Sequence, residues 1–147
     1  MSSMGYKGFT LIELIIVVSI VSILLVLTLP SYQRQLINTR RSLGVAELLD
    51  VMIRQEQYFI DHKRYAETLS DLGFLASPYA IGPDGEEVSV LAESRVYLID
   101  LTTSEYAYTL YAAPQLSQAE DRLCGILSLN SRGIKSASGD GPAPLCW

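Results

Sequence analysis

Two features near the start of the chain could take part in chemistry: the junction between Gly8 and Phe9, and the carboxylate of Glu13. Glu13 is the only ionisable residue in an apolar run that extends from Phe9 to Leu29. A carboxylate inside a membrane segment costs roughly 2.5 to 3.5 kcal/mol, so such a residue by default indicates a function. Cleavage after Gly8 would create an α-amine on Phe9 with a charge of about +1 at neutral pH. On a neighbouring copy of the chain, that amine could pair with Glu13 and compensate its burial.

The apolar run itself predicts a transmembrane helix. From Phe9 to Leu29 there are 21 residues without Pro or Gly. At about 1.5 Å per residue, a helix of this length spans a hydrocarbon core of about 30 Å. The alternative for Glu13 is a position near the lipid headgroups, from which its carboxylate would reach water.

Residues 7–13, Lys-Gly-Phe-Thr-Leu-Ile-Glu, resemble the class III signal peptide of type IV pilins and pseudopilins. The pattern of that family is a short basic leader ending in Gly, then Phe-Thr-Leu-Ile-Glu, an apolar stretch and a Pro near its far end. All of these features are present here. The resemblance implies that prepilin peptidase cuts between Gly8 and Phe9 and methylates the new amine of Phe9. It also implies that Glu13 guides docking and register in a filament, and that Pro30 marks a kink or a melted segment.

The two cysteines, Cys124 and Cys146, are an even pair. If the resemblance holds, the C-terminal part of the chain lies in an oxidising compartment, which favours a disulfide between them. Such a disulfide would contribute about 3 kcal/mol, and the alternative is a pair of free buried thiols. In pilins the loop bounded by these cysteines is exposed and meets partners. Residues 136–144 carry no packing signal, so we expect a floppy segment there.

The residues after Pro30 predict the elements that position these features. Residues 31–59 have the pattern of an amphipathic helix, whose apolar face contains Val45, Leu48, Leu49, Met52 and Phe59. Residues 61–94 form a connecting region with a short helix that ends at Gly73. Three strands are expected, at residues 95–102, 106–113 and 124–129, because these stretches are rich in β-branched or aromatic residues. They would form an antiparallel sheet with one face on the helix.

The expected fold class is therefore α+β, a type IV pilin fold with a long N-terminal helix packed on a small antiparallel sheet. The expected domains are a leader at 1–8, removed by prepilin peptidase, and a transmembrane or filament-core helix at 9–29. The amphipathic second half of the helix follows at 30–60. A globular head with the Cys-bounded C-terminal loop occupies 61–147.

The charges of the chain argue against nucleic-acid binding. The formal net charge is −5, and an acidic chain is a poor candidate for binding nucleic acid. The exception is a possible basic patch for DNA or a partner, formed by Arg122, Arg132 and Lys135. We expect Arg40 and Arg41 to lie on a solvated face, with contact to lipid headgroups or an acidic neighbouring subunit as the alternative.

No residue set predicts catalysis, a cofactor or a metal site. The single histidine, His62, stands without a cluster of ligands, and two cysteines are too few for structural zinc. The acidic turn at Asp84 lacks the alternating oxygen ligands of a calcium loop. Phosphate-binding loops and nucleophile motifs are missing from the sequence as well. We expect the chain to be the substrate of a peptidase and not an enzyme.

The expected function is that of a structural subunit, most similar to PilE-type minor pilins, which is assembled into a type IV pilus or primes it. Such a filament would serve adhesion, twitching motility or DNA uptake. The expected partners are other pilin subunits, prepilin peptidase, the inner-membrane assembly platform and inner-membrane lipid. The chain would be a single-pass inner-membrane protein with a periplasmic head before assembly, and part of the cell-surface pilus afterwards. The alternatives are a type II secretion pseudopilin, a DNA-binding competence pilin and a plain single-span anchor protein.

Overall fold

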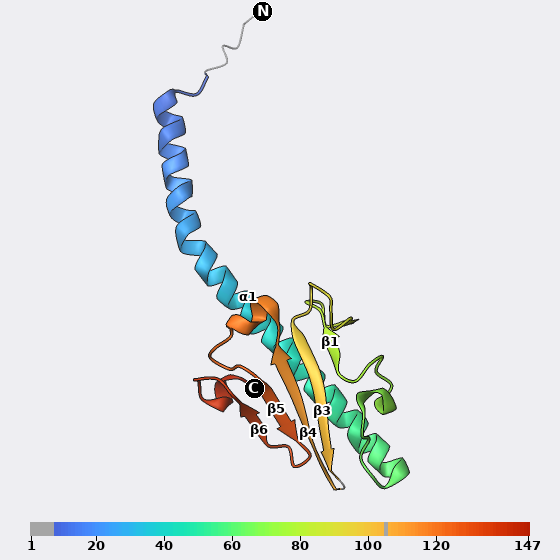
Figure 1. The fold of residues 1–147 in the computed structure, drawn as a ribbon. Helices are drawn as coiled ribbons and strands as arrows, with labels where there is room; N and C mark the ends of the chain where they lie inside the picture. Colours follow the sequence, from blue (N-terminus) through green and yellow to red (C-terminus); the bar gives the residue numbers. More distant parts are fainter. Residues whose placement is uncertain (1–7, 105) are drawn as a thin grey trace, which may run out of the picture. The chain divides into compact units, whose positions relative to one another are not determined.

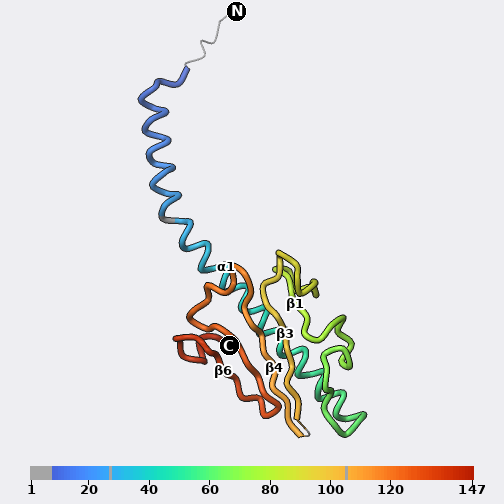
Figure 2. Tube along the Cα trace, viewed as in Figure 1, coloured from blue at the N-terminus to red at the C-terminus, as the bar shows by residue number. Residues whose placement is uncertain are grey.

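The computed structural model describes residues 8–104 and 106–147. The part of the expected leader that precedes Gly8 lies outside the described residues. One long helix, α1, runs from Leu11 to His62 and contains 52 residues (Figures 1 and 2). The chain divides into two compact units within this helix, between Leu36 and Ile37. This division falls later than residue 30, where we expect the amphipathic half of the helix to begin.

The first unit contains the apolar beginning of α1. Every residue from Phe9 to Leu29 whose side chain the structure describes is exposed, and Phe9 is 84% exposed. A window of 18 residues in this helix has a mean hydropathy of 2.9, so the helix is long and apolar enough to cross a membrane. A helix that is apolar on all sides needs an apolar surrounding, such as a bilayer or a bundle of similar helices.

The second unit is an antiparallel sheet covered on one face by the later part of α1 (Figure 1). Among the described residues the sheet has six strands in the order β2-β1-β3-β4-β5-β6, and each neighbouring pair is antiparallel. The strands are β1 (Tyr79–Ile81), β2 (Glu87–Val88), β3 (Tyr97–Ser104), β4 (Ala107–Pro114), β5 (Leu127–Asn130) and β6 (Lys135–Ala137). The 3-10 helices are η1 (Leu69–Leu72), η2 (Leu116–Glu120) and η3 (Ala143–Leu145). The expected α+β fold class is confirmed.

The core lies between α1 and the sheet, because successive side chains of a strand point to opposite faces. In β3 and β4 every second residue over part of each strand is buried, and the residues between them are partly or fully exposed. The largest buried apolar side chains of this core are Leu48, Leu69, Tyr79, Ile81, Tyr97, Ile99, Tyr108, Leu110, Leu127 and Leu129. Burial of a large apolar side chain contributes about 1.5 to 3 kcal/mol, so this cluster is the main source of stability in the second unit.

The buried face of α1 differs in part from the predicted one. Its buried positions are Arg41, Gly44, Leu48, Val51 and Gln55. Their spacing alternates between three and four residues, which keeps them on one face of a helix. The prediction is correct for Leu48, whereas Val45, Leu49, Met52 and Phe59 are only partly buried. The pattern was built from apolar residues, so it could not include Arg41 or Gln55.

The strand predictions are correct at the centre of the sheet and incomplete at its edges. The three predicted strands correspond to β3, β4 and β5, although β5 begins at Leu127 and not at Cys124. Strands β1 and β2 lie in the region that we expected to be a connection, and β6 begins directly before the segment expected to be floppy. With two or three residues each, β1, β2 and β6 are too short to show a period of two.

Candidate functional site

The proposed cleavage junction is accessible in the described chain. Gly8 and Phe9 are both exposed and precede the first residue of α1. A Cβ atom added at Gly8 would meet nothing within 4 Å. Packing inside the described chain therefore gives no reason for a glycine at this position. Cleavage after Gly8 and methylation of Phe9 remain predictions.

Glu13 lies in the first turn of α1, where the structure adds a feature that the sequence analysis missed. The backbone N–H of Glu13 donates to Oγ1 of Thr10 at 3.3 Å, so Thr10 caps the helix. The spacing Thr-x-x-Glu is that of a capping box, and it could have been read from the sequence. A carboxylate in the first helical turn is also favoured by the helix dipole. Within residues 8–104 and 106–147 the Glu13 carboxylate itself forms no ion pair or hydrogen bond.

The hydroxyl groups of the apolar segment are satisfied inside α1. Ser19 donates to the carbonyl oxygen of Ile15 at 2.8 Å, and Ser22 donates to that of Val18 at 2.7 Å. Thr28 donates to the carbonyl oxygen of Leu24 at 3.0 Å. These hydroxyl groups therefore need no water or partner. The Glu13 carboxylate, in contrast, still needs a polar or charged partner.

Pro30 lies inside α1, and the helix continues on both sides of it. A proline lacks the N–H that would bond to the carbonyl four residues earlier, and this loss weakens or bends a helix locally. A melted segment at Pro30 is not observed, because the residues around it remain helical. The kink remains a prediction.

Cys124 and Cys146 form a disulfide across a sequence separation of 22 residues. The expected pairing is confirmed, and among the described residues neither cysteine is free. The bond joins the stretch before β5 to the end of η3. It closes the Cys-bounded loop that the resemblance implied.

The segment after β6 is not floppy, contrary to our expectation. Consecutive backbone N–H groups of residues 138–141 donate to carbonyl oxygens of residues 122–126, at distances of 2.8 to 3.1 Å. The pairing between β5 and β6 is thus extended by backbone hydrogen bonds, which need no alternating pattern of side chains. The signal that we missed lies in Gly139, because a Cβ atom there would be 2.5 Å from the carbonyl oxygen of Arg122.

The three residues of the possible basic patch do not come together. Arg132 lies in the turn between β5 and β6, and Lys135 begins β6 beside this turn. The Nζ of Lys135 is 5.3 Å from the centre of the Trp147 ring. Arg122 precedes β5 and lies at the opposite end of that strand. The structure therefore supports a pair, Arg132 and Lys135, with Arg122 apart from it.

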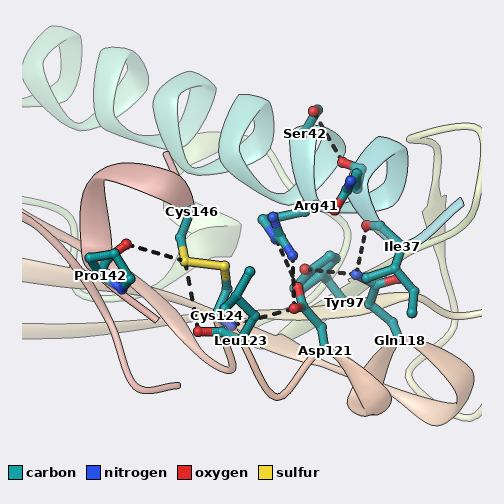
Figure 3. A network of polar contacts seen from close by, with 11 residues as sticks. Ile37, Arg41, Ser42, Tyr97, Gln118, Asp121, Leu123, Cys124, Pro142 and Cys146 are labelled. Atoms are coloured by element: carbon teal, nitrogen blue, oxygen red, sulfur yellow. Dashed lines mark hydrogen bonds and ion pairs between the residues drawn. A yellow bond between two sulfur atoms is a disulfide. The ribbon is translucent and has the colours of Figure 1, made fainter. Parts of the chain in front are cut away.

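Arg41 is buried and paired, so the expectation of a solvated face is wrong for this residue. Its Nε donates to Oδ2 of Asp121 at 2.8 Å, and its Nη2 donates to Oδ1 at 2.8 Å (Figure 3). The hydrogen bond with Asp121 raises the pKa of Arg41 further, against the opposing effect of burial. Oδ1 of Asp121 also accepts the backbone N–H of Cys124 at 3.3 Å. The ion pair thus links α1 to the stretch that carries the disulfide.

Gln118 makes a second link between η2 and α1. Its Nε2 donates to the carbonyl oxygen of Ile37 at 3.1 Å and to the hydroxyl of Tyr97 at 3.2 Å (Figure 3). Burial raises the pKa of Tyr97 to about 12. The Tyr97 hydroxyl therefore stays protonated at neutral pH, and its oxygen accepts from Gln118.

Two carboxylates of α1 meet tyrosine hydroxyls from the sheet side. The hydroxyl of Tyr79 donates to Oε1 of Glu47, and that of Tyr108 donates to Oε1 of Glu56 at 3.2 Å. Burial raises the pKa of Glu47, and the hydrogen bond from Tyr79 offsets part of this shift.

In the described ranges no group of three or more His, Cys, Asp or Glu side chains is placed to hold a metal ion.

Two family profiles match the chain. The profile described as "Type IV minor pilin ComP, DNA uptake sequence receptor" matches residues 30–128. The profile "Prokaryotic N-terminal methylation motif" matches residues 3–29. The first match includes Arg122 and ends before Arg132 and Lys135.

Curated relatives include pilins and a competence protein. The chain is 32% identical over 68 residues to the type IV major pilin protein PilA of Myxococcus xanthus (strain DK1622), covering 46% of this chain and 31% of that protein. It is 34% identical over 85 residues to the type IV major pilin protein PilE1 of Neisseria gonorrhoeae, covering 57% and 52%. It is 32% identical over 92 residues to competence protein ComGC of Bacillus subtilis (strain 168), covering 59% and 91%. The chain thus spans about a third and about half of the two major pilins that it matches.

A solved structure of a type IV pilin from Shewanella oneidensis is also similar to this chain. The two share 21% sequence identity with a TM-score of 0.47. The similarity covers 74% of this chain and 97% of that one.

Proposed function

Because this chain belongs to the type IV pilin family, in the group described as type IV minor pilin ComP, we propose that it is a minor subunit of a type IV pilus. In this proposal the segment 9–29 holds the subunit in the inner membrane before assembly. The same segment joins the helices of neighbouring subunits in the filament afterwards, and the second unit faces the periplasm and then the cell surface. Other pilin subunits and the inner-membrane assembly platform are the partners.

A single observation carries this proposal: Glu13 is an isolated carboxylate in an exposed apolar helix. The hydroxyl groups of Ser19, Ser22 and Thr28 are satisfied inside the helix, and the Glu13 carboxylate has no partner among the residues that the structure describes. Its partner would be the α-amine of Phe9 on a neighbouring subunit. A misdocked subunit would leave a buried charge unpaired, which is strongly penalised, so the pair would set the register.

The test is the variant Glu13→Gln, which removes the charge and keeps the size of the side chain. We expect normal insertion into the membrane and a loss of the subunit from sheared surface filaments. The matched control is Ser22→Ala, because the Ser22 hydroxyl bonds only to its own helix. Incorporation of the Glu13→Gln variant at the wild-type level would overturn the role of Glu13 in register.

Processing by prepilin peptidase is the second part of the proposal. Cleavage between Gly8 and Phe9 would remove the leader and create the amine that pairs with Glu13. Mass spectrometry of the N-terminal peptide from filaments should find N-methylated Phe9 as the first residue. A peptide that still contains residues before Phe9, in cells with active peptidase, would contradict this step.

A second candidate function, DNA uptake, is favoured by the family description over residues 30–128. The net charge of −5 argues against it, so the basic side chains would have to act locally. Binding would occur at Arg132 and Lys135, or at Arg122, which lies elsewhere. The full chain in detergent should then bind duplex DNA with a strong salt dependence. Arg132→Ala with Lys135→Ala, compared with Arg122→Ala, would separate the two surfaces, and absence of binding at low salt would dispose of this candidate.

A further inference from the structure

The first turns of α1 in the second unit, residues 37–42, are held to the rest of the unit without buried apolar side chains. From Ile37 to Ser42 no apolar side chain of the helix is buried. The first fully buried apolar side chain is that of Leu48, and Leu43 and Val45 are only partly buried. Close packing therefore holds α1 firmly only from about Gly44 onward, where the helix backbone lies against the Tyr97 ring. Something else must hold residues 37–42.

Polar contacts from one segment fill this role. We call Ser117, Gln118 and Asp121 the η2 clamp. Gln118 binds the carbonyl oxygen of Ile37 at 3.1 Å, and Ser117 accepts from Nη1 of Arg40 at 3.0 Å.

Asp121 adds the bidentate pair with Arg41 described above, with both bonds at 2.8 Å (Figure 3). The clamp thus reaches three positions of α1 that lie within five residues of each other. It begins at Ile37, the first residue of the second unit.

The burial of the clamp makes each of these contacts consequential. Gln118 is fully buried, and the Asp121 side chain is 2% exposed. Removing one partner of a buried polar contact leaves the other without a hydrogen bond, which costs more than the bond contributes. Loss of a clamp residue should therefore release the helix locally.

The clamp is also incompletely satisfied, which distinguishes it from the other buried glutamine contact of α1. Nε of Arg40 and Oε1 of Gln118 are buried without a hydrogen-bond partner in the part of the chain that the structure describes. Gln55, by contrast, bonds through both atoms of its amide to the backbone of Ala66. Of these two polar attachments, the η2 clamp is the one more easily opened.

We propose that the η2 clamp decides where the part of α1 that is held by the second unit begins. With the clamp closed, α1 is held from Ile37 onward. With the clamp open, it is held only from about Gly44, where the helix backbone lies against the Tyr97 ring, so about seven more residues of α1 are released from the sheet. The clamp thus sets how much of α1 can change its conformation independently of the sheet. This inference does not depend on the role of the chain in a pilus.

The test is hydrogen–deuterium exchange of the full chain in detergent micelles, followed in peptides that cover residues 37–43 and 48–58. Gln118→Ala opens one contact of the clamp. The double variant Arg41→Ala with Asp121→Ala removes the ion pair without leaving an unpaired charge and without putting apolar packing in its place. In both variants we expect exchange in 37–43 to be at least about tenfold faster, as for a lost buried hydrogen bond. Exchange in 48–58 should stay close to wild type.

The matched control is Gln55→Ala, which removes a glutamine that is equally buried but lies outside the clamp. It should accelerate exchange around residues 55–66 and leave 37–43 unchanged. Unchanged exchange in 37–43 in both clamp variants would overturn the proposal. An equal acceleration of 37–43 in the Gln55→Ala variant would overturn it too, because the effect would then be general destabilisation.

Discussion

The ring of Tyr97 packs directly on the backbone of α1 at Gly44. A Cβ atom at Gly44 would lie 3.1 Å from both Cδ2 and Cε2 of the ring. Tyr97 is fully buried, and its hydroxyl is held by Gln118. The ring therefore has little freedom to move away. Gly44 is a position of close approach between the helix and the sheet. The contact with Tyr97 offsets the low helix propensity of glycine.

Replacement of Gly44 by alanine tests this contact. Alanine improves helix propensity by about 1 kcal/mol, whereas an added methyl group in a packed core costs about 1 to 3 kcal/mol. We expect a net loss of about 1 kcal/mol in the free energy of unfolding, measured by denaturant titration of the full chain. Ser42→Ala, at an exposed position nearby, should be close to neutral. In a Tyr97→Leu background the same Gly44→Ala change should be stabilising, and a stabilising effect in the wild type would contradict the close approach.

Gly139→Ala tests the backbone pairing of the Cys-bounded loop. The new Cβ atom would be 2.5 Å from the carbonyl oxygen of Arg122, a backbone atom with no freedom to swing away. We expect loss of the adjoining hydrogen bonds and a destabilisation of about 3 kcal/mol with the disulfide intact. The control is Asp140→Ala, because the exposed Asp140 side chain does not take part in the pairing. A melting temperature equal to that of the control would show that this loop tolerates the change.

The N-terminal features could be predicted because their residues are close in sequence. Gly8, Phe9 and Glu13 form one short motif, and the family expected from it is confirmed by both family profiles. The length of the apolar run was also enough to predict the first part of α1. Local patterns of this kind need no knowledge of the fold.

The contacts of the second unit could not be predicted, because they join distant residues. Arg41 and Asp121 are 80 residues apart, and an arginine beside another arginine on a helix is typical of a solvated face. Glycine lowers helix propensity, and the reason for Gly44 is its contact with Tyr97 in a distant strand, which no local pattern shows. The backbone pairing of Gly139 left no side-chain pattern to detect.

Glu47 should make the stability of the second unit dependent on pH. Burial raises the pKa of this carboxyl above its ordinary value of 4.5, and Asp50 and Glu87 add to the shift while Arg54 opposes it. Between the ordinary and the raised pKa, the folded state holds a proton that the unfolded state has lost. Stability therefore falls as the pH rises through this window.

The variant Glu47→Gln checks this dependence, because it removes the titration and can still accept from Tyr79. Its free energy of unfolding should vary less between pH 4 and pH 7 than that of the wild type, and it should be at least as large at pH 7. Glu93→Gln, which changes an exposed carboxylate, serves as the control for net charge. Parallel pH profiles of the wild type and the Glu47→Gln variant would contradict the shift.

The Arg41–Asp121 pair should matter to stability mainly through the cost of breaking it. The two side chains are 11% and 2% exposed, so Asp121→Ala leaves a buried guanidinium without its partner. We expect a loss of about 3 to 5 kcal/mol in the free energy of unfolding. The double variant Arg41→Met with Asp121→Leu removes both charges and should recover most of this loss.

Asp121→Asn separates the charge from the hydrogen bonds of this site. Asparagine can still accept the backbone N–H of Cys124, but it no longer neutralises Arg41. We expect this variant to be less stable than the double variant, because an unpaired buried charge costs more than a missing hydrogen bond. Equal stability of Asp121→Asn and the wild type in denaturant titrations would mean that Arg41 reaches water. The ion pair would then contribute no more than a surface pair does.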